Sequence, residues 1–162
     1  MACAEPPAAA VPPDATAART IVSPSPAPAT LAGAVLPNPA LTPGETFAGV
    51  TSAQVCVRGY ASSVRNVTHE QYLAVYAEYG IPYPEPPGTY ELDHLVPLEL
   101  GGDNSDRNLW PEPAAPAPGF HQKDDLENYL HDAVCAGRLN LVDAQRGIAS
   151  DWALLYQEYL HP

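Results

Sequence analysis

A chain of 162 residues is long enough for one domain of ordinary size and too short for two large ones. Its net charge of -12 excludes a protein that relies on a basic surface to hold nucleic acid tightly, because such affinity comes from Lys and Arg side chains that neutralise phosphates. No apolar run approaches the ~20 residues that a membrane-spanning helix needs, so the sequence predicts no transmembrane segment.

The beginning of the chain differs in composition from the rest. Ten of the 20 prolines fall within residues 1–45, where no aromatic residue occurs. Such a sequence lacks the apolar side chains that offset the entropy of ordering, so we expect a disordered Pro/Ala-rich leader over residues 1–46 and one folded domain over residues 47–162. The opening Met-Ala-Cys-Ala is typical of a processed export leader and predicts a secreted protein or one tethered to the cell envelope, with the cytoplasm as the alternative.

The first half of the folded part predicts one clear helix. Residues 54–57 are typical of a short strand, and residues 60–67 of irregular structure. Thr68 and Gln71 have the spacing of a capping box, and apolar or aromatic residues then recur at helical spacing up to Gly80. Residues 81–88 contain four prolines and predict a loop.

The second half predicts a hairpin followed by two helices. Residues 90–100 indicate a strand interrupted at Pro97, residues 101–104 a turn, and residues 107–110 a second short strand. After the proline-rich residues 111–119, the periodicity predicts a helix over residues 123–135. Asn140 is expected to cap a last helix. The predicted fold class is therefore α+β.

Three cysteines occur, Cys3, Cys56 and Cys135, and no C-x-x-C pair is present, which argues against a structural zinc knuckle. A disulfide between Cys56 and Cys135 would close a loop of about 80 residues and stabilise the fold by roughly 4 kcal/mol. Two buried free thiols are the alternative. A disulfide would support the prediction of secretion.

Three segments carry the only recognisable motif. They are Asp93-His94-Leu95-Val96-Pro97-Leu98-Glu99-Leu100-Gly101-Gly102, then Asn108-Leu109-Trp110-Pro111, then His121-Gln122-Lys123-Asp124. Together they resemble the HNH endonuclease family, and more narrowly actinobacterial-type secreted HNH-like proteins, over roughly residues 54–160. The resemblance implies a small ββα-metal unit of a hairpin and a helix, with flanking helices packed against it.

The resemblance also implies a division of labour in phosphodiester hydrolysis. Asp93 and His121 would bind one divalent metal ion, Mg²⁺ first, with Mn²⁺, Ni²⁺ or Zn²⁺ as alternatives. His94 would be the general base, since an imidazole has a suitable pKa near neutrality. Asn108 would hydrogen-bond across the hairpin loop and orient His94. His121 has a simpler alternative as a surface residue at a helix start, with Glu99 or Asp124 completing the site.

The expected substrate is nucleic acid, DNA rather than RNA, engaged transiently. Arg65, Arg107 and Lys123 are candidate phosphate-binding residues, although pairing with carboxylates is the more ordinary role for each. Residues 91–132 contain ten Asp or Glu and two Arg or Lys, a net of -8, which would repel DNA. A rival interpretation is therefore a secreted, non-catalytic structural or interaction module that retains the ββα scaffold, with the leader as an envelope tether.

Overall fold

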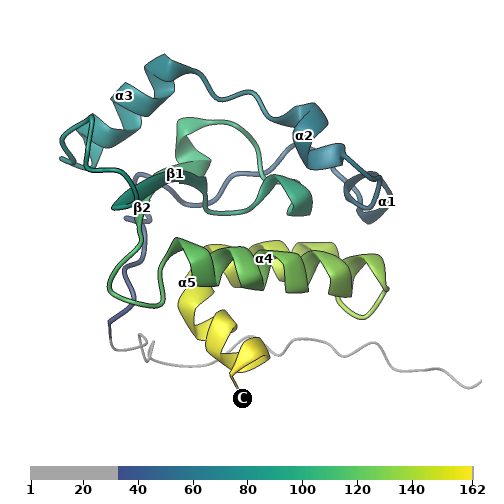
Figure 1. Ribbon diagram of the computed structural model, residues 1–162. Coiled ribbons are helices and arrows are strands. Elements are labelled where there is room, and N and C mark those ends of the chain that lie inside the picture. Colours follow the sequence, from purple (N-terminus) through teal and green to yellow (C-terminus); the bar gives the residue numbers. More distant parts are fainter. Residues whose placement is uncertain (1–32, 162) are drawn as a thin grey trace, which may run out of the picture.

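The computed structural model describes residues 33–161 and confirms a mixed α+β fold. Figure 1 shows a small hairpin between helices. In chain order the elements are α1 (Ser52–Val55), α2 (Tyr60–Val64), α3 (His69–Glu78), β1 (Tyr90–His94), the 3₁₀ turns η1 (Leu98–Leu100) and η2 (Asp106–Asn108), β2 (Leu109–Pro113), α4 (Phe120–Cys135) and α5 (Leu141–Leu160).

The β1–β2 hairpin separates two layers of helices. Its antiparallel register pairs Asp93 with Trp110 and His94 with Leu109. Because neighbouring side chains on a strand point to opposite faces, Asp93 and Trp110 share one face, and His94 and Leu109 share the other. Figure 1 shows α3 on one side of the hairpin and α4 with α5 on the other. The hairpin therefore presents Asp93 to α4.

Two hydrophobic clusters hold these layers. The smaller one joins α3 to the hairpin through Val75, Tyr76, Leu92 and Leu109. The larger one lies between the hairpin, α4 and α5, and its buried members include Trp110, Leu126, Leu130, Ile148 and Trp152. Burial of apolar area on both sides fixes the hairpin between the helices.

The predicted helix ends are largely confirmed. The Thr68 hydroxyl accepts from the Gln71 backbone N–H at 3.2 Å, and the Gln71 amide oxygen accepts from the Thr68 N–H at 3.0 Å, which completes the capping box of α3. Asn140 caps α5 by accepting from the Val142 N–H. α5 is interrupted at Asp151, whose φ of -165° and ψ of 89° are not helical.

Three predictions of local structure are wrong. Residues 54–57 do not form a strand, because a capping box of Thr51 and Gln54 starts helix α1 there. Residues 60–67 are not wholly irregular, since α2 occupies the first five. The first strand ends at His94 rather than near residue 100, because the chain turns before Pro97 into η1.

The folded part also begins earlier than residue 46. Thr42 is 1% exposed; its hydroxyl donates to the Leu109 carbonyl at 2.9 Å and hydrogen-bonds the Tyr79 hydroxyl at 2.7 Å. Thr46 forms a bridge with Gly102. The boundary at residue 46 is therefore corrected, because residues before it supply polar ties to α3 and β2. The predicted disorder of residues 1–32 concerns a part of the chain outside the described residues.

A Cys56–Cys135 disulfide joins the end of α1 to the end of α4, with the two Cα atoms 5.5 Å apart. This confirms the predicted pairing and excludes two free thiols. Within residues 33–161, no helix combines the length and the apolar character needed to cross a bilayer.

Candidate functional site

The motif residues Asp93 and His94 end strand β1 and point to opposite faces of the hairpin. Asp93 faces α4, and its side chain is 18% exposed. His94 faces the other layer and is 2% exposed. The two side chains therefore have different surroundings.

Lys123 is the residue of α4 that meets Asp93. Its side chain is 1% exposed, and its Nζ lies 2.5 Å from Asp93 Oδ2 and 2.8 Å from the His94 carbonyl oxygen. The third partner of Nζ is the Glu127 carboxylate, one helical turn further on. All three ammonium donors are thus satisfied inside the protein. Lys123 is therefore a structural partner of Asp93 and has no donor left for a substrate phosphate.

A third carboxyl group completes this acidic cluster, which we define as Asp93, Glu112, Lys123 and Glu127. Glu112 lies on β2, is fully buried, and places Oε2 3.9 Å from Lys123 Nζ. At that distance it is an ion-pair neighbour, not a hydrogen-bond partner, of the ammonium. Three carboxyl groups therefore surround one cation in a site almost closed to water.

Burial and mutual repulsion set the charge of the cluster. Burial raises the pKa of Glu112 to about 10, although Lys123 acts in the opposite direction. Burial likewise raises the pKa of Glu127 to about 8. Burial would also raise the pKa of Asp93, but the Lys123 ammonium outweighs it and holds that pKa below its ordinary value. The favoured state near neutrality is a Lys123–Asp93 ion pair with a protonated Glu112, whose hydroxyl can donate to Asp93.

This arrangement does not fit a divalent cation at Asp93. The inner oxygen of that carboxylate is already bound by a positive charge, and the ammonium would repel a second cation at the same position. The other two carboxyl groups of the cluster, Glu112 and Glu127, have raised pKa values, which disfavours the ionised form that a metal ligand needs.

His94 is held by a polar contact on the other face of the hairpin. Its Nε2 donates to Asn104 Oδ1 at 3.3 Å, and Asn104 in turn donates to the Val64 carbonyl at 2.9 Å. Burial lowers the pKa of His94, which favours the neutral imidazole, while the Asp93 carboxylate acts in the opposite direction. A neutral imidazole has the charge state of a general base, but this one is almost inaccessible to water.

Asn108 makes the cross-loop hydrogen bonds that were predicted for it. Its Oδ1 accepts from the Val96 N–H, and its Nδ2 donates to the carbonyls of Val96 and Asp103, each at 2.9 Å. Gly102 lies against this clamp, and a Cβ there would stand 1.8 Å from the Val96 carbonyl oxygen. Asn108 therefore closes the loop after β1, whereas the amide that contacts His94 is that of Asn104.

The remaining candidates lie on the surface. His121 is exposed at the start of α4, and its ring packs on Phe120 with the centroids 4.3 Å apart. The α4 residue that binds Asp93 is Lys123. The role of His121 as a metal ligand stays a prediction. Arg107 pairs with Glu45 at 3.0 Å, and Arg65 is exposed.

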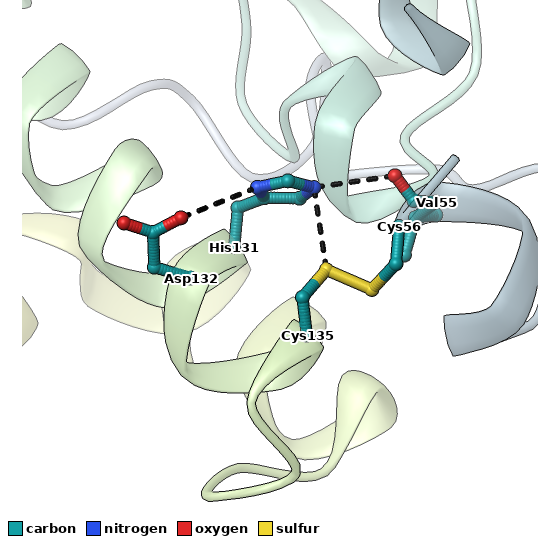
Figure 2. Close-up of a disulfide and its surroundings, with 5 residues drawn as sticks. All are labelled: Val55, Cys56, His131, Asp132 and Cys135. Carbon is teal, nitrogen blue, oxygen red and sulfur yellow. Dashed lines mark hydrogen bonds and ion pairs between the residues drawn. A yellow bond between two sulfur atoms is a disulfide. The ribbon is translucent and has the colours of Figure 1, made fainter. Parts of the chain in front are cut away.

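One group within residues 33–161 brings three potential metal ligands together. It consists of Cys56, His131 and Cys135, whose ligand atoms all lie within 4.8 Å of one another. Figure 2 shows the imidazole beside the disulfide. This group could hold a metal ion, but its two sulfurs are bonded to each other in this structure.

Sequence reasoning missed the parts played by Glu112, Glu127 and Asn104. A signal for the cluster was nevertheless present, because Lys123 shares a helical face with Leu126, Leu130 and Val134, all of which are buried. A lysine on the apolar face of a helix needs a buried anion, and Glu127 stands four residues further on.

Comparison with protein-family models, curated proteins and solved structures finds no match for this chain.

Proposed function

We propose that this domain is a secreted structural or interaction module that keeps a nuclease-like hairpin and helix, but neutralises its acidic centre with a lysine and not with a divalent cation. The contact between Lys123 Nζ, which is 1% exposed, and Asp93 Oδ2, 2.5 Å long, carries this proposal. A hydrolase of the HNH type needs Asp93 free for a metal and His94 open to water. Here the first is paired and the second is 2% exposed.

The charge of the domain and its disulfide support the same proposal. A net of -8 over residues 91–132 opposes the approach of a polyanion to the hairpin. The Cys56–Cys135 bridge is typical of proteins that work in oxidising compartments, which supports secretion.

A plasmid-nicking assay with the full chain tests the proposal. The protein would be incubated with Mg²⁺, Mn²⁺, Ni²⁺ or Zn²⁺, with and without EDTA, and single-stranded RNA would be tested in parallel. We expect no cleavage above that of buffer, and a melting temperature that Mg²⁺ and EDTA leave unchanged. Cleavage that EDTA abolishes, and that disappears in the His94→Ala variant but persists in His69→Ala, would refute the proposal.

A metal-dependent nuclease is the second candidate, and a specific arrangement favours it. Asp93-His94 stands at a strand end, and Asn108 closes the following loop by three hydrogen bonds, as the HNH resemblance implies. In that case Asp93 would have to exchange the Lys123 ammonium for a cation, with His121 as a second ligand. Calorimetry distinguishes the candidates: the nuclease predicts divalent-metal binding that weakens about 10-fold or more in Asp93→Ala and His121→Ala.

A further inference from the structure

The group of Cys56, His131 and Cys135 lies at the junction of α1 and α4. Cys56 follows the last residue of α1, while His131 and Cys135 stand four residues apart on α4, so their side chains share one face of that helix. His131 is four residues beyond Glu127, about 6 Å along the helix axis, so this junction lies one helical turn away from the nearest member of the acidic cluster. Figure 2 shows His131 Nε2 directed at both the Cys135 sulfur and the Val55 carbonyl.

We propose that this junction is a redox-gated metal site, in which the thiolates of Cys56 and Cys135 and Nε2 of His131 bind one Zn²⁺ after the disulfide has been reduced. An external dithiol supplies the reduction: it gives two electrons and two protons to the S–S bond and becomes a disulfide itself. Each cysteine thiol then loses its proton to solvent as its sulfur binds the metal. The bond between α1 and α4 is thereby exchanged for a metal bridge.

The donor set suits zinc and other soft divalent ions. Two thiolates and an imidazole are ligands that zinc sites commonly use, and a water molecule would fill the fourth position. While the disulfide is intact, neither sulfur carries the negative charge that a metal ligand needs. The oxidised state therefore closes the site and the reduced state opens it.

The surroundings allow the necessary movement. Two sulfurs that share a tetrahedral zinc ion lie about 3.8 Å apart, since each Zn–S bond is about 2.3 Å long, so the bonded sulfurs must separate. His131 and Cys135 are fixed by α4, but Cys56 is exposed at the end of a four-residue helix. Val55, 1% exposed, anchors that helix in the core and keeps Cys56 near α4 after reduction.

The Val55 carbonyl and the Asp132 carboxylate lie beside the two ring nitrogens of His131, one near each nitrogen. In the disulfide form, Nε2 carries the hydrogen and donates to the Val55 carbonyl at 3.2 Å. The Asp132 carboxylate lies 3.9 Å from Nδ1. Metal binding moves the hydrogen to Nδ1, the ring nitrogen that has the Asp132 carboxylate as an ion-pair neighbour, and leaves the Nε2 lone pair for the cation.

Metal titration of the full chain in a Cys3→Ser background, which removes the third thiol, tests the site. A phosphine reductant would open the disulfide, Co²⁺ would serve as the spectroscopic probe, and Zn²⁺ would compete with it. We expect one equivalent of Co²⁺ with a thiolate-to-metal charge-transfer band after reduction, and none before. His131→Ala should weaken binding at least about 10-fold, whereas His69→Ala, an exposed histidine on α3, should bind as the parent does.

The same titration also tests the proposal if the reduced chain unfolds. In that case Zn²⁺ should restore the cooperative melt, and the exposed Asp132→Asn variant should need more Zn²⁺ to do so. The proposal is overturned if the reduced parent binds no cobalt and zinc restores nothing. It is equally overturned if the oxidised protein binds as well as the reduced one, or if His131→Ala and the parent have the same affinity.

Discussion

The face of the β1–β2 hairpin that meets α4 buries the acidic cluster, whereas the face that meets α3 is packed mainly by apolar side chains. On the first face, Lys123 is surrounded by Asp93, Glu112 and Glu127. On the second, Leu92 and Leu109 pack against Val75 and Tyr76. Both faces are largely buried, but the stability of the α4 face depends on a matched set of charges, whereas that of the α3 face depends on the apolar area it buries.

This difference separates two kinds of stabilisation. Apolar contact contributes free energy in proportion to the area it removes from water, and the loss of one side chain leaves the others intact. A buried ion cluster contributes little net free energy, because desolvation offsets attraction, yet the loss of one partner leaves an uncompensated charge. The α4 face should therefore be the more sensitive one to a single change of charge and to pH.

The largest expected effect is that of Lys123→Met. The substitution keeps most of the side-chain volume but removes the cation, so Asp93 would remain charged without a partner or would have to take up a proton. We expect the free energy of unfolding to fall by about 3–5 kcal/mol in urea denaturation. Arg146→Met, at an exposed cation on α5, should change it by less than about 0.5 kcal/mol.

A loss for Lys123→Met as small as that of the control would contradict the proposed role of the acidic cluster. Added Mg²⁺ sharpens the result, because three carboxyl groups without their lysine present the kind of oxygen ligands that divalent cations prefer. If Mg²⁺ restores stability to the variant and leaves the parent unchanged, the Lys123 ammonium occupies the position that a divalent metal ion could otherwise take.

The pH dependence is the next effect in size. A carboxyl group whose pKa is higher in the folded state than in the unfolded state keeps its proton when the protein folds. Its contribution to the free energy of unfolding is complete below the unfolded-state pKa, near 4.3, and is lost as pH rises towards the folded-state pKa. Glu127, with a pKa of about 8, should make the free energy of unfolding fall between about pH 5 and 8, by up to about 1.4 kcal/mol per pH unit. Urea denaturation at several pH values measures this slope.

Glu127→Gln imitates the protonated carboxyl and should reduce that slope, leaving the part that Glu112, with a pKa of about 10, contributes over the same pH range. Glu70→Gln, exposed at the start of α3, should leave the slope unchanged. Asp93 acts in the opposite sense: its lowered pKa means that its stabilisation is present above about pH 4 and is lost on further acidification. An equal slope in Glu127→Gln and the parent would mean that the cluster is not the source of the pH dependence.

The amino-acid sequence predicted the α3 face of the hairpin better than the α4 face. The apolar face followed from helical spacing and from the capping box of Thr68 and Gln71, both of which are local signals. The position of the hairpin and the Cys56–Cys135 pairing were also predicted, since turn residues and cysteine number constrain them. The acidic cluster was not, because its members come from β1, β2 and α4, and only tertiary packing brings them together.

Two further errors have equally physical causes. Val55 and Val57 favour a strand by propensity, but the capping box at Thr51 and the burial of Val55 against α4 select a short helix. The segment before residue 46 has no aromatic residue and is rich in Pro and Ala, so composition assigned it to the leader. What fixes it to the fold is the hydrogen bonding of Thr42 together with the packing of Ala34 and Leu36 against the larger hydrophobic cluster, and composition reveals neither.

The smallest expected effect concerns that hydrogen bonding on the apolar face. Thr42→Val keeps the shape of the side chain but removes the hydroxyl, so the buried Leu109 carbonyl loses this donor and the Tyr79 hydroxyl keeps its bond from the Asn38 N–H but loses the one to Thr42. We expect a loss of about 1–2 kcal/mol in thermal or urea unfolding, independent of pH between about 5 and 8 because no titrating group is involved. Tyr79→Phe in a double-mutant cycle should show a coupling of at least about 0.5 kcal/mol with Thr42, since the two hydroxyls share one hydrogen bond. A loss from Thr42→Val as large as that from Lys123→Met would remove the distinction between the faces, because a single neutral hydrogen bond would then matter as much as a buried charge.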